Sequence, residues 1–156
     1  AVPPRPGSRA LRRGRVSITG QLYHVTSRAL PDTSPFGNFD NARAACAAFH
    51  RVQRQSADQV HAWVLMPDHA HWLISLGPAS SLSGFVGALK RESARAVREA
   101  ACTEIGRPLW MSSFHDRALR DTDDVLAVAR YIVANPLRAG LVKRLGDYPF
   151  WNALWV

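Results

Sequence analysis

Residues 66–74 of the chain read Met-Pro-Asp-His-Ala-His-Trp-Leu-Ile, a proline turn followed by β-forming residues. The turn and the composition after it predict a strand over residues 69–76. Because side chains alternate between the two faces of a strand, His69 and His71 project from the same face. Neutral imidazole is the commonest metal ligand among protein side chains, so the pair is half of a site for a divalent ion.

The opposite face of this predicted strand carries the bulkier apolar side chains of Ala70, Trp72 and Ile74. We expect these side chains to pack against helices, which leaves both histidines on the open face of a sheet. The alternative is that the histidines are core residues bonded to backbone carbonyl groups. The strand predicted just before it, over residues 60–66, favours a hairpin.

The surrounding segments predict the order β-α-β-β-α-β followed by one more helix. This is the order of the ferredoxin-like α+β fold, in which helices cover one face of the sheet. Asn41 and Asp121 are the predicted N-caps of the first and last helices, with Asp123 and Asp124 in the first turn of the last. The predicted strands are 16–29, 60–66, 69–76 and 110–119, and the predicted helices are 41–55, 82–101 and the segment from 121 to Pro136.

The charge of the chain is strongly positive, with 20 Lys and Arg against 12 Asp and Glu in 156 residues. An imbalance of this size indicates a polyanionic partner such as nucleic acid, the alternative being simple solubility. Cys46 and Cys102 lack the spacing of a disulfide framework or metal site. Without an apolar run long enough for a membrane span or a signal peptide, we expect a cytoplasmic protein associated with the nucleoid.

Two sets of arginines and one further arginine are candidate DNA contacts. Residues 1–15 hold five arginines and no acid, which predicts a flexible basic arm ahead of a single domain over residues 16–156. The alternatives are a solubilising tail for the arm and solvated surface charges for each arginine. The candidates are Arg12, Arg13 and Arg15 of the arm, the helical stripe Arg91, Arg95 and Arg98, and Arg120.

The last predicted helix carries two more candidate site residues, Tyr131 and Asn135, four positions apart and so on one face. A phenol can attack phosphorus and form a covalent intermediate, and an amide oxygen can bind a hard cation. The alternative for Tyr131 is a boundary residue whose ring packs beside Val128 and Ile132.

Four segments occur along the chain in the order Tyr23–Arg28, Val64–Leu73, Phe114–Arg120 and Tyr131–Val142. Together they resemble the REP-associated tyrosine transposases, a branch of the small single-tyrosine HUH transposases linked to repetitive extragenic palindromes (REPs). The resemblance runs from about Gln21 to Trp151, and Asp68 stands where Asn is most often found.

The resemblance implies a ferredoxin-like HUH nuclease that acts on single-stranded DNA and DNA hairpins with Mg²⁺ or Mn²⁺. It makes His69 and His71 metal ligands, Tyr131 the nucleophile and Asn135 a third ligand. The expected function is cleavage and rejoining of REP hairpins through a 5′-phosphotyrosyl intermediate, by a monomer or a homodimer.

Two other functions stay open from the sequence. One is a REP-hairpin-binding regulator that does not cleave, although such a protein needs neither the histidine pair nor Tyr131. The other is an unrelated metallohydrolase of the cupin type, which the number of helices and the positive charge disfavour. The aromatic tail with Trp151 and Trp155 is predicted to cover the core.

Overall fold

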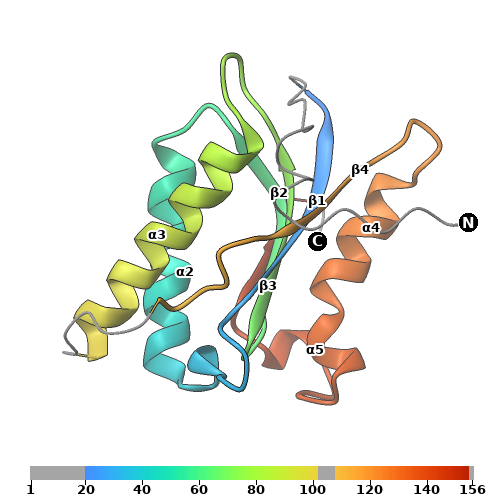
Figure 1. Cartoon of the computed structure of the whole chain (residues 1–156). Helices are drawn as coiled ribbons and strands as arrows, with labels where there is room; N and C mark the ends of the chain where they lie inside the picture. The colour runs from blue at the N-terminus through green and yellow to red at the C-terminus, as the bar shows by residue number, and fades with distance from the viewer. Residues whose placement is uncertain (1–19, 102–107, 155–156) are drawn as a thin grey trace, which may run out of the picture.

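The structure, a computed structural model, describes residues 20–101 and 108–154. In that part of the chain five strands form one sheet in the order β4-β1-β3-β2-β5, with antiparallel neighbours throughout (Figure 1). The predicted ferredoxin-like order is confirmed, with β5 as an addition at one edge. The strands are β1 (Leu22–Arg28), β2 (Gln59–Leu65), β3 (His69–Ser75), β4 (His115–Ala118) and β5 (Trp151–Ala153).

Helices lie on both faces of the sheet (Figure 1). The long helices α2 (Phe39–Arg54) and α3 (Leu82–Ala101) pack against each other on one face. On the other face α4 (Val125–Val133) packs mainly over β2, and the single turn α5 (Asn135–Arg138) follows it. That face is therefore only partly open, because the last helix covers its β2 side. The short helices η1 (Pro35–Gly37) and η2 (Leu145–Asp147) complete the described helical segments.

The sheet separates two apolar cores. As predicted, Ala70, Trp72 and Ile74 are fully buried on the side of α2 and α3. The second core joins Leu73 on the opposite face of β3 to Ile132 of α4, together with residues of β2 and the C-terminal segment. Because each face of β3 meets its own core, the direction of its side chains is fixed along the strand.

The first predicted N-cap is wrong by three residues. Asn38, not Asn41, caps α2, because the Asn38 side chain accepts a hydrogen bond from the backbone N–H of Asn41 at 3.0 Å. Asn41 is thus inside the first turn, where its side chain donates to the carbonyl of Pro35. Both positions carry a residue that favours N-caps, and the helix starts at the earlier one.

The predicted N-cap of the last helix is also wrong. Asp124, not Asp121, caps α4 through a 3.1 Å bond from the backbone N–H of Ala127. Asp123 does not join the first turn; its carboxylate accepts the backbone N–H of Arg120 at 2.6 Å and so closes the loop before the helix. The segment holds three acids, Asp121, Asp123 and Asp124. Asp124 is the N-cap because its side chain accepts the backbone N–H three residues further along the chain.

The predicted strand over residues 110–119 is shorter in the structure. Only His115–Ala118 forms β4, while Trp110 makes an isolated bridge with Ala29. The first strand begins at Leu22, and residues 16–19 of its predicted range lie outside the described residues. The predicted basic arm over residues 1–15 also lies outside them.

The aromatic tail forms a strand that the sequence pattern did not predict. Trp151 of β5 pairs with Val64 of β2, and its ring packs against the second core, as expected for a tail that covers the core. The hydroxyl of Tyr148 donates to the carbonyl of Leu65, which fixes the tail at the end of β2. Trp155 lies outside the described residues. None of the described helices is long and apolar enough to cross a membrane.

Candidate active site

The face of the sheet that meets α4 has a polar half on β1 and β4. Thr26 of β1 is paired with His71 of β3 on one side and with His115 of β4 on the other. His24 is likewise paired with Leu73 and Arg117. Directly opposed residues of antiparallel strands project from the same face, so a polar strip runs beside the apolar half under α4.

His71 is held by two side chains of the neighbouring strand β1. Its Nδ1 lies 3.0 Å from the Nε2 of His24 and 3.0 Å from the Oγ1 of Thr26. The described residues offer no hydrogen bond to its other ring nitrogen, Nε2. When Nδ1 carries the proton and donates, the lone pair of Nε2 is left for a metal ion.

The surroundings also keep His71 in the neutral form that binds metals. Burial is the main cause that lowers the pKa of His71 to about 3. Positive charge nearby contributes in the same direction, in the order His24, His69, Arg138 and Arg28.

His69 is oriented by the residue that precedes it. The Nδ1 of its ring lies 2.7 Å from the Oδ1 of Asp68, and its centroid is 5.1 Å from that of His71. A carboxylate behind a histidine is a usual arrangement at metal sites, since it fixes the tautomer and makes the ligating nitrogen more basic. Asp68, at the position where the resemblance leads us to expect Asn, therefore serves as an acceptor for His69.

Tyr131 is exposed on the last turn of α4, with 56% of its surface accessible. This exposure does not fit the alternative of a packed boundary residue. The guanidinium carbon of Arg138 in α5 lies 3.7 Å from the centroid of the Tyr131 ring, a cation–π contact. Tyr131 also lines a groove of about 460 Å³ with His24 and Arg117 of the polar strip. The structure thus brings the tyrosine to the polar half of the sheet.

Asn135 does not share one uninterrupted helix with Tyr131, in contrast to the prediction. Helix α4 ends at Val133, and Asn135 begins α5 just before Pro136. The amide nitrogen of Asn135 donates to the carbonyl of Ile132 at 2.9 Å, and the described residues make no hydrogen bond to the amide oxygen. That oxygen is the atom that the predicted role as third ligand requires.

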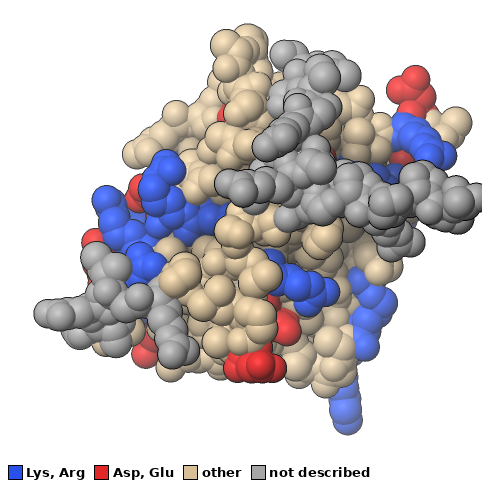
Figure 2. Space-filling view, in the orientation of Figure 1, with Lys and Arg blue, Asp and Glu red and all other residues tan. Residues whose placement is uncertain are grey.

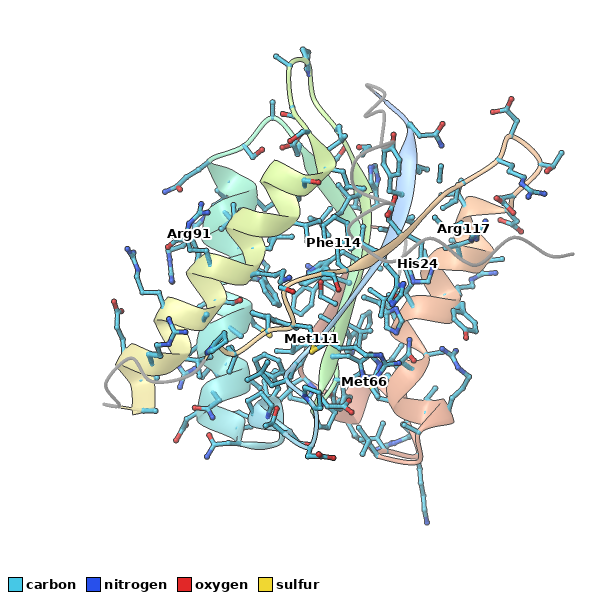
Figure 3. All side chains as sticks on the ribbon, viewed as in Figure 1. His24, Met66, Arg91, Met111, Phe114 and Arg117 are labelled. Carbon is cyan, nitrogen blue, oxygen red and sulfur yellow. The ribbon has the colours of Figure 1, made fainter. Side chains whose placement is uncertain are left out.

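The predicted arginine stripe lies on the other side of the molecule. Arg91 is on α3, whereas His24 and Arg117 lie toward α4 (Figure 3). Arg95 forms ion pairs with Glu92 at 3.3 Å and Glu99 at 3.8 Å. Figure 2 shows basic side chains on both the α3 side and the α4 side. The stripe, completed by Arg98, is therefore not brought together with the histidine pair.

The remaining predicted DNA contacts are placed in part. Arg120 is exposed in the loop between β4 and α4, where its backbone N–H donates to Asp123. The pairing of Ala118 with Tyr23 puts this loop at the end of β1 away from His69 and His71. Arg12, Arg13 and Arg15 lie outside the described residues.

Sequence reasoning left the roles of several polar-strip residues unassigned. The alternation of His24, Thr26 and Arg28 predicts that they share one strand face, but it gives them no role, and a core histidine bonded within the protein is the alternative for His24. Arg138 lies in the family segment that begins at Tyr131, but no spacing rule predicts its contact with the ring. Arg117 could be assigned only once β4 was paired with β1.

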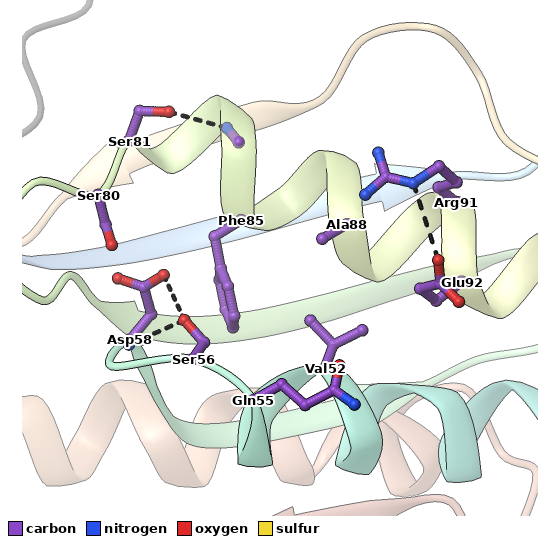
Figure 4. A pocket seen from close by; sticks show the side chains of 11 residues that line it. Val52, Gln55, Ser56, Asp58, Ser80, Ser81, Phe85, Ala88, Arg91 and Glu92 are labelled. Atoms are coloured by element: carbon purple, nitrogen blue, oxygen red, sulfur yellow. Dashed lines mark hydrogen bonds and ion pairs between the residues drawn. The ribbon is translucent and has the colours of Figure 1, made fainter.

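A second cavity, of about 410 Å³, lies between α2 and α3 (Figure 4). Its buried Asp58 accepts hydrogen bonds from Ser56 at 2.7 Å and from the backbone of Gly77 at 2.8 Å. The carboxylate is satisfied within the protein, and we assign no site there.

The donor set of the histidine pair is incomplete on its own. In the described part of the chain, no group of three His, Cys, Asp or Glu residues is placed to hold a metal ion. A metal ion at the histidine pair would need another kind of ligand as well, such as an amide, a water molecule or a phosphate oxygen.

A profile of the family described as "Transposase IS200 like" matches residues 36–135, which include both histidines, Tyr131 and Asn135. The chain belongs to this family. The REP-associated tyrosine transposase of Escherichia coli (strain K12) is 30% identical to this chain over 106 residues. That alignment covers 66% of this chain and 59% of the relative, so the chain spans less than two thirds of the relative's length.

Two solved structures are similar to this chain. A REP-associated tyrosine transposase bound to a REP hairpin has a TM-score of 0.69 and 25% identity, over 88% of this chain and 79% of that chain. A protein from Deinococcus radiodurans has a TM-score of 0.57 and 21% identity, over 82% of this chain and 90% of that chain, and supports the fold alone. The resemblance to REP-associated tyrosine transposases predicted from the sequence is confirmed.

Proposed function

We propose that the protein is a metal-dependent endonuclease and strand transferase that acts on the single-stranded DNA of REP hairpins. The observation that carries the proposal is the hydrogen bonding of the histidine pair. His69 and His71 each have Nδ1 occupied by a protein partner, which leaves Nε2 of both rings for a cation. An exposed tyrosine shares a groove with the same polar strip.

The residues present fit a divalent ion such as Mg²⁺ or Mn²⁺. His69 and His71 would supply two nitrogen ligands, and the amide oxygen of Asn135 is the proposed third. When bound, the ion would polarise the scissile phosphate and offset the negative charge that develops on it. Asp68 and Thr26 orient the two rings for this purpose.

Tyr131 is the proposed nucleophile. Its Oη forms a bond to phosphorus as the bond from phosphorus to the 3′ oxygen breaks. The phenol gives up its proton and the departing 3′ oxygen takes one, so the products are a 5′-phosphotyrosyl link and a free 3′-OH. Because the phosphodiester is exchanged and not hydrolysed, a second 3′-OH can reverse the step and rejoin DNA.

The proposed DNA contacts are electrostatic. Arg120 is exposed in the loop between β4 and α4, and the other candidates are the arm residues Arg12, Arg13 and Arg15 and the stripe Arg91, Arg95 and Arg98. Arginine suits phosphate oxygens because its planar group donates two parallel hydrogen bonds. The similar REP-associated tyrosine transposase is bound to a REP hairpin, which supports this substrate class.

Trapping of the covalent product tests the proposal. Incubation with a labelled REP-hairpin oligonucleotide and Mn²⁺ should give a protein–DNA adduct that survives denaturation. Tyr131→Phe should abolish the adduct and leave DNA binding nearly unchanged, because only the Oη atom is removed. Tyr148→Phe is the matched control, since its hydroxyl is buried against the carbonyl of Leu65 and should not matter for the adduct.

Two outcomes would contradict the proposal in different ways. An adduct formed by Tyr131→Phe would show that another residue is the nucleophile. Tight hairpin binding by the unchanged chain with no adduct under any metal condition would instead support the regulator that binds without cleaving.

A further inference from the structure

A third cavity, of about 400 Å³, lies between α3 and the segment 108–114 that leads to β4. We name it the α3 groove. Lys90, Arg91 and Arg98 of α3 line it, and the described residues of its lining include no acid. Much of the rest of the lining is apolar, namely Ala94, Pro108, Leu109, Trp110, Met111 and Phe114. The α3 groove thus combines positive charge with an apolar floor.

The two walls of the α3 groove are joined by hydrogen bonds of the protein itself. The Nζ of Lys90 donates to the carbonyl of Met111 at 2.6 Å. The Nε1 of Trp110 donates to the Oγ of Ser93 at 3.0 Å. Because both bonds connect α3 to the segment 108–114, the shape of the groove is fixed, and a ligand does not have to order it.

Met111 connects the α3 groove to the candidate active site. Its backbone N–H donates to the carbonyl of Arg28 at 2.8 Å, and Arg28 is paired with His69 in the sheet. Met111 also lines a smaller cavity, of about 220 Å³, together with Arg28. Figure 3 shows Met111 between Arg91 on α3 and His24 on β1. A DNA strand that leaves the histidine pair past Arg28 therefore reaches Met111 and then the α3 groove.

The smaller cavity offers no net positive charge for phosphate binding. Asp32 and Asp68 line it beside Arg28, so its carboxylates outnumber its guanidinium group. The carboxylate of Asp68 also accepts from His69 at 2.7 Å. We therefore place phosphate contacts in the α3 groove and none in the smaller cavity.

Two glutamates of α3 lie near the arginine stripe, but they leave Arg91 available to a phosphate. Glu92 is 3.8 Å from Arg91 and 3.3 Å from Arg95, and Glu99 is 3.8 Å from Arg95. The contact with Arg91 is longer than a hydrogen bond, and exposed ion pairs of this kind are weak. A phosphate that accepts two hydrogen bonds from the guanidinium group can replace such a contact. Arg95 carries most of the pairing with the glutamates and does not line the groove.

The lining of the α3 groove fits single-stranded DNA better than a duplex. Proteins that bind single strands combine a positively charged groove with surfaces on which unpaired bases lie. Leu109 and Met111 are half-buried and offer such a surface, and the thioether of Met adapts its shape to different bases. A duplex keeps its bases stacked inside and would leave this floor unused.

We propose that the α3 groove is a second DNA site, which binds the single strand that extends from the hairpin beyond the active site. Arg91 and Arg98 contact its phosphates, and Leu109 and Met111 contact its bases. This inference rests on the proposed function. It also divides the predicted stripe, because Arg95 takes no part in the site.

Fluorescence anisotropy with labelled REP-hairpin oligonucleotides tests the proposal, in EDTA and at physiological salt. One oligonucleotide is the hairpin alone. Two others carry about eight unpaired thymidines at the 5′ or the 3′ end, a length usual for a single-strand site. The full chain is compared with Arg91→Gln, Arg98→Gln and, as the matched control, Arg95→Gln. The control removes the same charge from the same stripe but outside the groove.

We expect a tail at one of the two ends to raise the affinity of the unchanged chain about tenfold, which is what two exposed ion pairs together can give. Arg91→Gln and Arg98→Gln should each lose about threefold of this gain. Arg95→Gln should keep the gain. Binding of the hairpin alone should change little in all three variants, and circular dichroism melting should show all three folded.

A tail that adds no affinity at either end would overturn the inference. So would an equal loss in Arg95→Gln, because the general charge of α3 and not the groove would then be the cause. Equal losses for the hairpin with and without a tail would assign these arginines to the duplex and also reject the single-strand site. Failure of the unchanged chain to bind any of the hairpins would contradict the proposed function itself, whereas trapping of the Tyr131 adduct tests cleavage whatever the groove binds.

Discussion

The two histidines of the candidate site are held by unlike partners. His69 meets the carboxylate of its sequence neighbour, whereas His71 meets a neutral imidazole and a hydroxyl from another strand. The carboxylate accepts a hydrogen bond from the ring of His69 and fixes its tautomer, and the imidazole and the hydroxyl fix the orientation of His71. Loss of Asp68 is expected to release the tautomer of His69, and loss of Thr26 is expected to release the orientation of His71.

Thr26→Val removes the hydroxyl beside His71 and keeps the shape of the side chain. We expect Mn²⁺ affinity to fall about tenfold, as is usual when a partner that orients a ligand is removed, with little change in stability. Ser27→Ala is the matched control, because the Ser27 hydroxyl is buried on the other face of β1 with no partner among the described residues. Equal Mn²⁺ affinities in the two variants would contradict the role of Thr26.

Asp123 has a pKa below its ordinary value of 3.8, first because the backbone of Arg120 donates to it and then because Arg117 does. A carboxyl group with a lowered folded pKa stabilises the fold above its unfolded pKa, and this contribution is lost as pH falls through the folded value. We expect the ¹³C titration midpoint of Asp123 to lie below 3.8 and to rise in Arg117→Gln. A midpoint unchanged by that substitution would exclude the contact with Arg117 as a cause.

The period of a strand was sufficient to place His69 and His71 on one face and the apolar set on the other. The contacts that complete the site were not predictable in this way. His24 and His71 are 47 positions apart, and their contact depends on the register between β1 and β3. The local sequence contains no signal for that register, because either strand face offers side chains of suitable size.

At the scale of single elements, α4 carries Tyr131, the proposed nucleophile, and its N-cap is Asp124. Asp124→Ala removes the side chain that accepts the backbone N–H of Ala127, so we expect a loss of about 1 kcal/mol in the free energy of unfolding. Urea unfolding followed by circular dichroism measures it. Asp121→Ala is the control and should change stability by less than about 0.5 kcal/mol. The reverse order would restore Asp121 as the cap.

The boundaries of a helix or strand were predicted accurately where its local sequence pattern was regular, and less accurately where it was not. The bounds of α3, Leu82–Ala101, were predicted as found, because its apolar period is regular over five turns of helix or more. The N-caps were displaced where suitable residues stand three apart, as at Asn38 and Asn41. Strand β5 was missed because three residues in an aromatic tail carry no period of their own.

At the scale of the whole molecule, the sheet lies between the candidate active site on one face and the apolar core under α2 and α3 on the other. The order of elements predicted this layering, since the ferredoxin-like order places its two helices on one face. It did not predict that α4 packs over β2, because the apolar stripe of a terminal helix does not specify which surface it will meet.

The salt dependence of hairpin binding tests whether the two arginine sets contact DNA phosphates. We expect the hairpin affinity of the unchanged chain to fall steeply with salt, since bound Lys and Arg displace counterions from phosphates. Replacing Arg12, Arg13 and Arg15 by Gln should reduce the slope by about one for each phosphate that is no longer neutralised. The same change at Arg91, Arg95 and Arg98 should reduce it less, because Glu92 and Glu99 already pair with the stripe. A flat response in the unchanged chain would contradict both sets as contacts.

The pairing of Thr26 with His71 has a consequence for how the protein folds. The histidine pair belongs to the hairpin of β2 and β3, which can close early because its strands are neighbours in sequence. The partner of His71 comes from β1, 45 positions away, and a slip of one residue would present Val25 or Ser27 to the wrong face. If the pair binds Mn²⁺ as proposed, the rate of Mn²⁺ binding during refolding would therefore report when β1 pairs with β3 in its native register.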